Sequence, residues 1–64
     1  MNSNPVFDEK AAAAYLNMSV KTLQGRRSKH VAPAYIKAGR SVRYLKEDLD
    51  TFLASCRVDP EARN

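Results

Sequence analysis

Residues 8–27 most constrain what this 64-residue chain can fold into, because they carry the signals for two short helices joined by a tight turn. Asp8 is a good N-cap, since its carboxylate accepts hydrogen bonds from the free N–H groups of a first helical turn. The four alanines at 11–14 then extend a helix at low cost. Asn17 tolerates the left-handed conformation that ends a helix, and Ser19 is a good cap for a second helix that starts one residue later. The pattern therefore predicts a helix, a turn and a second helix.

Small and apolar residues fall where two such helices would cross. Ala13 allows close approach, Met18 lies in the turn, and Leu23 lies on the inner side of the second helix. The buried stripe predicted for the first helix, at helical spacing, is Ala12, Tyr15 and Leu16. An interior glycine, Gly25, costs about 1 kcal/mol relative to alanine. The second helix is therefore expected to fray after Gln24, or to need contacts with DNA to order its last turn.

Polar and basic side chains remain for the outward side of the second helix. They are Lys21, Thr22, Gln24 and Arg27. Glutamine pairs bidentately with adenine and arginine with guanine in the major groove of DNA, so this side suits base edges and phosphates. The same residues are also compatible with a generic helical hairpin whose polar face is only solvated.

Acidic residues are absent between Glu9 and Glu47, although the whole chain carries a formal charge of only +4. The basic residues in this interval are Lys10, Lys21, Arg26, Arg27, Lys29, Lys37, Arg40, Arg43 and Lys46. A solvated globular surface usually mixes both signs of charge. This segregation therefore favours a surface that faces phosphates over one that only confers solubility.

Residues 34–44, AYIKAGRSVRY, predict a two-stranded hairpin with Gly39 at positive φ in its turn. An isolated hairpin is unstable in water, so this one must lie against the helices. We interpret it as a basic wing with Arg40 and Ser41 at or beside its tip. For Lys37, a role in keeping the exposed face of the hairpin hydrated is an equally good interpretation.

Residues from Lys46 to about Arg57 predict a third helix with acidic residues in its first turn, as the helix dipole favours. Its apolar stripe, at i, i+3, i+4 and i+7, is Leu49, Phe52, Leu53 and Cys56. Cys56 is therefore interpreted as a small core residue rather than a nucleophile. The acidic outer side of this helix should point away from DNA.

These elements predict a mostly α fold with a small β-hairpin, a winged helix-turn-helix. Residues 7–57 would form the DNA-binding domain, between a disordered N-terminal tail at 1–6 and a C-terminal tail at 58–64. Because the chain has one Cys and one His, neither a disulfide nor a zinc site can be assembled within it, and we expect no metal and no cofactor. No paired carboxylates converge and no base neighbours a Ser or Cys, so we expect neither an enzyme nor a small-molecule substrate. The sequence shows no signal peptide and no apolar run near membrane-spanning length, so a cytoplasmic protein without a membrane partner is expected.

The runs AAAAYLNMSVKTLQGRR and PAYIKAGRSVRYLKEDLDTFL resemble the small excisionase-type, AlpA-like proteins with a MerR-like winged helix-turn-helix. The resemblance covers about residues 7–56, and its most specific pieces are AAAAYLNMSVKTL and GRSVRYLKEDLDTFL. Proteins of this family are carried by prophages, integrative elements and plasmids. They act as recombination directionality factors, which bend attachment-site DNA so that an integrase excises the element, or as transcriptional regulators.

The resemblance also implies contacts with double-stranded DNA residue by residue. At or near the major groove it places Lys21, Thr22, Gln24 and Arg27, with Ser19 on a phosphate. On the minor groove or its flanking phosphates it places Arg40 and Ser41, and Lys37 or Arg43 beside them. Family members often have a large aromatic residue where this chain has Arg26, which would bury only its stem while its head reaches solvent or phosphate.

One copy of so small a domain would bind weakly, so adjacent copies on DNA are expected to touch one another. An integrase would be a further partner, and the protein would associate with the bacterial nucleoid. Two alternatives stay open at this point. One is a transcriptional regulator of the same family that acts at a promoter, and the other is an adaptor whose basic face meets an acidic protein.

Overall fold

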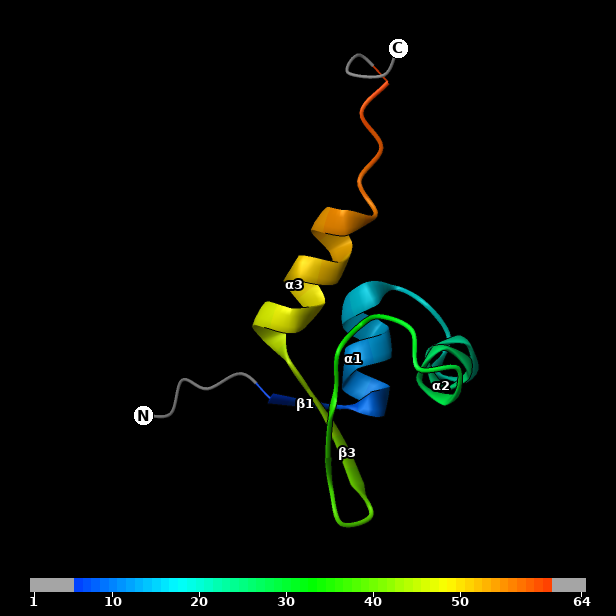
Figure 1. Cartoon of the computed structure of the whole chain (residues 1–64), viewed down its shortest axis with the longest axis vertical. Helices are drawn as coiled ribbons and strands as arrows, with labels where there is room; N and C mark the ends of the chain where they lie inside the picture. The colour runs from blue at the N-terminus through cyan, green and yellow to red at the C-terminus, as the bar shows by residue number, and fades with distance from the viewer. Residues whose placement is uncertain (1–5, 61–64) are drawn as a thin grey trace.

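The computed structural model describes residues 6–60, which contain three helices and three short strands (Figure 1). In order they are β1 (Val6–Asp8), α1 (Glu9–Leu16), α2 (Val20–Ser28), β2 (Ile36–Ala38), β3 (Ser41–Leu45) and α3 (Lys46–Ser55). The expected mostly α fold with a β-hairpin is confirmed, and one strand, β1, is additional. The tails predicted at 1–6 and 58–64 fall largely outside the described residues. Val6 itself belongs to β1, and residues 58–60 form neither helix nor strand.

Both ends of α1 use the residues that the sequence indicated. The Asp8 carboxylate accepts a hydrogen bond from the Ala11 N–H at 2.7 Å. Asn17 adopts the left-handed conformation, with φ 59° and ψ 44°. Its N–H donates to the Ala14 carbonyl at 3.0 Å, and the next N–H in the chain donates to the carbonyl of residue 13 at 2.9 Å. Two carbonyls at the helix end are thereby satisfied while the chain turns toward α2.

The predicted cap of α2 is confirmed, but the prediction that this helix frays after Gln24 is wrong. The Ser19 hydroxyl accepts from the Thr22 N–H at 3.0 Å. The helix then continues past Gly25 to Ser28. Its last turn is closed by His30, which takes φ 58° so that backbone N–H groups of residues 30 and 31 reach the carbonyls of residues 27 and 26, each at 3.0 Å. These bonds offset the cost of an interior glycine without any DNA.

The three strands form one antiparallel sheet in the order β1-β3-β2, with β3 in the centre. The hairpin turn consists of two residues, Gly39 and Arg40, and Gly39 takes the expected positive φ of 63°. On the other side of β3, Phe7 pairs with Tyr44. Side chains on a strand alternate between faces, so the buried Tyr44 defines the face that packs on the helices.

The core contains seven buried side chains drawn from all three helices and β3. They are Ala12, Ala13, Leu16, Leu23, Tyr44, Leu49 and Phe52. Three residues expected in the core are instead exposed. Tyr15 is 39% exposed and lies at the edge of the core. Its ring packs edge-on against Phe7 at 5.2 Å, and its hydroxyl donates to Asp50. Leu53 is 41% exposed, and Cys56 is also exposed, because the C-terminal end of α3 extends beyond α1 (Figure 1).

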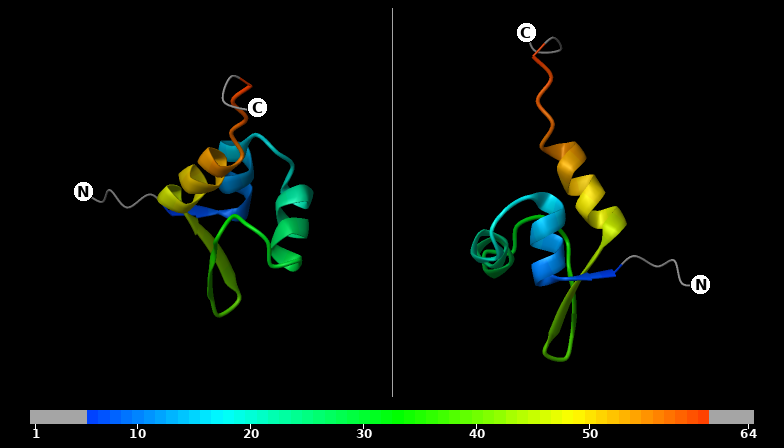
Figure 2. Two further views of the ribbon diagram at one scale, coloured as in Figure 1. Left: turned by 45° about the horizontal axis from the view of Figure 1, so that its top comes forward. Right: turned by 180° about the vertical axis from the view of Figure 1, so that it is seen from behind.

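Helix α1 lies between α2 and α3 in the views of Figures 1 and 2, while the hairpin extends away from the C-terminal end of α3. The acidic first turn of α3 holds Glu47 and Asp48. The expectation that the acidic side of α3 points away from DNA stays a prediction.

We predict that Asn17→Ala lowers the free energy of unfolding by about 1 kcal/mol, because a side chain with a Cβ and no local hydrogen-bonding group is strained in the left-handed conformation. In a thermal melt followed by circular dichroism this corresponds to a fall in Tm of about 4–8 °C. Asn17→Gly is the matched control and should retain the wild-type Tm or raise it. Equal losses in the two variants would contradict this account of the turn.

Candidate nucleic-acid interface

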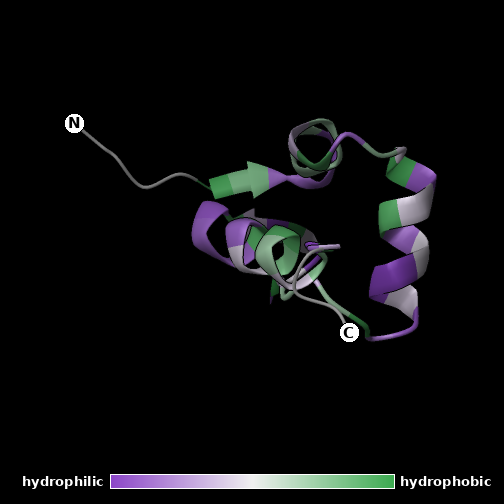
Figure 3. Ribbon diagram, turned by 90° about the horizontal axis from the view of Figure 1, so that it is seen from above, coloured by the Kyte–Doolittle hydropathy of each residue, from purple (hydrophilic) through white to green (hydrophobic). Residues whose placement is uncertain are grey.

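One side of α2 faces away from the hydrophobic core. Leu23 is fully buried and defines the inner side. At 3.6 residues per turn, the opposite side is centred on Lys21, Gly25 and Ser28, with Gln24 and Thr22 at its margins. The side chains of Lys21, Thr22 and Gln24 are exposed, as expected. Hydrophilic and near-neutral colours predominate along this helix in Figure 3.

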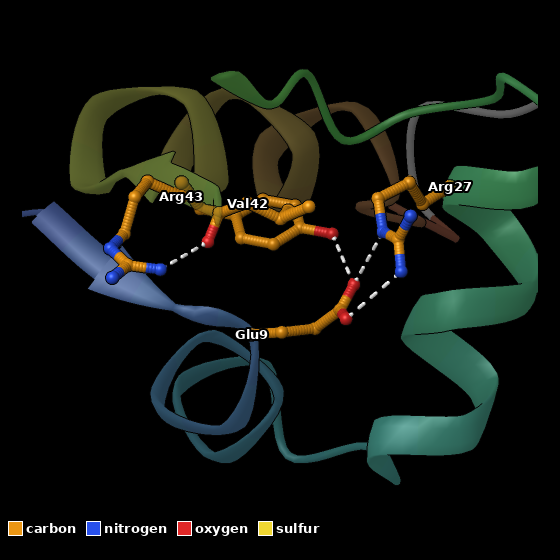
Figure 4. Close-up of polar contacts among 5 residues, drawn as sticks. Glu9, Arg27, Val42 and Arg43 are labelled. Atoms are coloured by element: carbon orange, nitrogen blue, oxygen red, sulfur yellow. Dashed lines mark hydrogen bonds and ion pairs between the residues drawn. The ribbon is translucent and has the colours of Figure 1, made fainter. Parts of the chain in front are cut away.

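Arg27 does not lie on this outward side, because its side chain turns toward α1, and its expected contact with DNA bases stays a prediction that this structure does not support. Its Nε donates to Glu9 Oε2 at 2.8 Å, and one terminal nitrogen donates to Glu9 Oε1 at 3.2 Å. Glu9 Oε2 also accepts from the Tyr44 hydroxyl at 2.9 Å. Figure 4 shows the three side chains converging from α2, α1 and β3. We call Glu9, Arg27 and Tyr44 the carboxylate clamp.

The clamp is an electrostatic unit as well as a geometric one. The hydrogen bond from Arg27 is the largest of the effects that lower the pKa of Glu9 below its usual 4.5. Burial, followed by the neighbouring Glu9 carboxylate, raises the pKa of Tyr44 to about 12. At neutral pH the clamp therefore holds a charged carboxylate, a charged guanidinium and a neutral phenol. The negative charge of Glu9, the acidic residue of α1 and α2, is thus balanced by the positive charge of Arg27.

Arg26 also turns inward. Its Nε donates to the Ala32 carbonyl at 2.5 Å, and its guanidinium lies 5.0 Å from the centre of the Phe52 ring. Arg26 thereby joins α2 to α3 and to the connection that leads into β2, which includes a cis peptide bond between Ala32 and Pro33. A contact of its head with phosphate stays a prediction.

The basic residues predicted in the wing divide between two faces of the sheet. Lys37 pairs with Val42, and both lie on the face of Tyr44, toward the helices. Arg40 lies in the turn. Ser41 and Arg43 lie on the opposite face, and Arg43 donates to the carbonyl of residue 42 at 2.8 Å (Figure 4). Lys37 and Arg40 are therefore the wing cations placed to act with α2.

Ser19 and Lys29 lie at the two ends of α2. The Ser19 hydroxyl is exposed but already used, since it accepts from the Thr22 N–H and donates to the Thr22 hydroxyl at 2.8 Å. Lys29 is exposed at the end of α2, four residues after Gly25 and eight after Lys21, so it extends the outward row. Sequence reasoning did not place Lys29 there, although its i+8 spacing from Lys21 was a usable signal.

Within 6–60, no group of three His, Cys, Asp or Glu side chains has a geometry that would hold a metal ion. In the same part of the chain, every helix is too short or too polar to cross a bilayer.

A comparison with known families decides what kind of module this is. A family model described as a helix-turn-helix domain matches residues 6–57, which is most of the chain. The chain belongs to this helix-turn-helix family. Membership implies binding to double-stranded DNA, and α1 and α2 are the two helices of the motif. No curated protein matched the chain in a separate comparison.

We predict that Glu9→Gln destabilises the helix-turn-helix domain by about 1 kcal/mol at pH 7, because the clamp then loses its charge-assisted hydrogen bonds. The pKa of Glu9 is lowered on folding, so the charged carboxylate stabilises the fold above its unfolded pKa of about 4.5. This contribution is lost as the pH falls through the folded pKa. The stability difference between wild type and Glu9→Gln should therefore shrink at acid pH.

Urea denaturation at a series of pH values between 7 and 3 measures this difference directly. Glu47→Gln, which removes an exposed carboxylate on α3, is the matched control. A wild-type advantage over Glu9→Gln that stays constant down to the lowest pH would contradict the assigned role of the ionised Glu9.

Proposed function

We propose that this helix-turn-helix domain is a sequence-specific architectural DNA-binding protein, an excisionase that bends attachment-site DNA and so directs an integrase toward excision of a mobile element. The observation that carries the proposal is the exposed polar and basic side of α2, at Lys21, Thr22 and Gln24, in a helix-turn-helix domain. Two exposed wing cations, Lys37 and Arg40, add positive charge that suits a duplex. The resemblance of its sequence to the excisionase-type proteins supports the finer assignment.

In the proposed complex α2 lies in the major groove. Gln24 reads a base edge, with Lys21 and Thr22 beside it, and Ser19 lies near a phosphate at the start of the helix. Arg40 and Lys37 contact the flanking phosphates or the minor groove. Arg27 acts indirectly by holding α2 against α1 and β3, through its 2.8 Å ion pair with Glu9. Arg26 does the same toward α3.

Size is a second argument for an architectural role. A module of this class buries about 600–1,000 Å² on DNA, so one copy is expected to bind weakly. Adjacent copies that touch one another would raise the occupancy of a site and would help to offset the elastic cost of a bent duplex. We propose self-association on DNA, an integrase as a further partner, and a cytoplasmic, nucleoid-associated location. We propose no catalytic activity.

The decisive experiment is an excision assay. A plasmid that carries the two attachment sites of the host element is incubated with its integrase, with and without this protein. Excision that requires the protein supports the proposal, and a bend in a circular-permutation gel assay supports the architectural mechanism. A promoter-reporter response without any effect on excision would instead identify a transcriptional regulator. Failure to bind any duplex at low salt would favour the adaptor.

We predict that Arg40→Ala weakens binding to all duplexes and makes the log–log salt dependence shallower by about one unit, because one phosphate contact is lost. Arg43→Ala removes the same charge from the opposite face of the same hairpin and is the matched control. Fluorescence anisotropy at several salt concentrations measures both slopes. Equal slopes for the two variants would remove the wing turn from the DNA contacts.

We also predict that Gln24→Ala reduces the preference for the cognate site over random DNA, at a cost of about 1–3 kcal/mol, if the side chain makes a bidentate base contact. Competition binding with cognate and random duplexes measures this preference. Loss of affinity by the same factor on both duplexes would show that Gln24 does not read a base.

A further inference from the structure

Gly25 lies at the centre of the outward side of α2, where a glycine has no evident role in the fold. It is an interior residue of a nine-residue helix, at which glycine costs about 1 kcal/mol relative to alanine. Its φ is not positive, in contrast to that of Gly39, so the backbone does not require glycine. A Cβ added at Gly25 would meet nothing within 4 Å. Both the backbone and the packing would therefore accept alanine.

The surroundings of Gly25 form a notch in the surface of α2. At i−4 and i+4 lie Lys21 and Lys29, whose side chains are exposed. At i−3 and i+3 lie Thr22 and Ser28, which are short and polar. Two long cations therefore stand on either side of a point at which the helix has no side chain. At this point no side chain separates the helix backbone from a molecule that approaches between the two lysines.

The two lysines lie along the helix on either side of Gly25. Eight residues of α-helix rise by about 12 Å, so Lys21 and Lys29 are separated by about this distance along a groove in which the helix lies. Their long, flexible side chains can extend sideways to the phosphates that flank the groove. The helix segment between them then faces the floor of the groove, where base edges are exposed.

We propose that Gly25 is the point of closest approach between α2 and the bases, and that its missing side chain determines how deeply the recognition helix seats in the major groove. This inference rests on the proposed binding of DNA through α2, and it adds a specificity-determining residue to that surface. Any side chain at position 25 would hold the helix away from the groove floor. Gln24, one residue earlier, would then lose its base contact, while the lysines would keep their phosphates.

The test compares two substitutions that differ in size but have similar helix propensity. Gly25→Ala and Gly25→Leu should both raise the Tm, by about 4–8 °C, because each replaces glycine in a helix interior. The cognate duplex is first selected from a random library with the wild-type protein. Affinity for this duplex should fall about tenfold in Gly25→Ala and by more in Gly25→Leu. Affinity for random duplexes, which depends on phosphates, should change by less than about twofold.

Ser28→Ala is the control for a change in helix stability, because it also favours the helix and adds no atoms to the outward side. Graded loss of specificity with size at position 25, together with a wild-type response of Ser28→Ala, supports the inference. Cognate binding that is unchanged or tighter in Gly25→Ala would overturn it, while wild-type binding to DNA would leave the proposed function intact. Absence of duplex binding by the wild type itself would overturn both.

Discussion

The two-pronged ion pair between Arg27 and Glu9 is the interaction on which the rest of the structure depends. It joins the second helix of the motif to the first, and the hydroxyl of the buried Tyr44 attaches β3 to the same carboxylate. Two consecutive helices and a strand whose Tyr44 lies 35 positions after Glu9 are thereby fixed at one point. Within residues 6–60 the hydrophobic core has seven buried side chains, and in so small a core a polar connection of this kind helps to fix the position of α2.

The same interaction explains how a chain with a formal charge of only +4 presents a basic surface. Glu9 is the first acidic residue after the α1 cap, and its charge is compensated within the clamp. Asp50 on α3 is likewise engaged, by Lys46 at 2.8 Å and by the Tyr15 hydroxyl. Helix α2 itself contains no acidic residue, so the exposed Lys21 has no acidic neighbour on its own helix. Positive charge therefore dominates the side that phosphates would approach.

Sequence signals predicted the local features of this fold and missed those that depend on distant partners. The caps at Asp8, Asn17 and Ser19 and the turn at Gly39 follow from the chemistry of single residues, and all are confirmed. Strand β1 has only three residues and is stabilised by pairing with β3, which lies 35 to 39 positions later in the chain. The sequence around β1 therefore carries no pattern from which the strand could be predicted. The inward direction of Arg27 was equally invisible, because a basic residue late in a recognition helix reads as a DNA contact until a carboxylate from α1 is placed beside it. Helical periodicity also predicted too many buried residues on α3, since Leu53 and Cys56 are exposed. Periodicity identifies the apolar side of a helix, but it does not show how far the neighbouring helix extends along that side.

The direct junction between β3 and α3 has a mechanical consequence. Strand β3 ends at Leu45 and α3 starts at Lys46, with no loop between them, and β3 is the central strand of the sheet. The turn of the wing at Arg40 and the exposed Leu53 of α3 are thus joined through β3 and α3 without an intervening loop. Tyr44, which ties β3 to Glu9, lies on this connection.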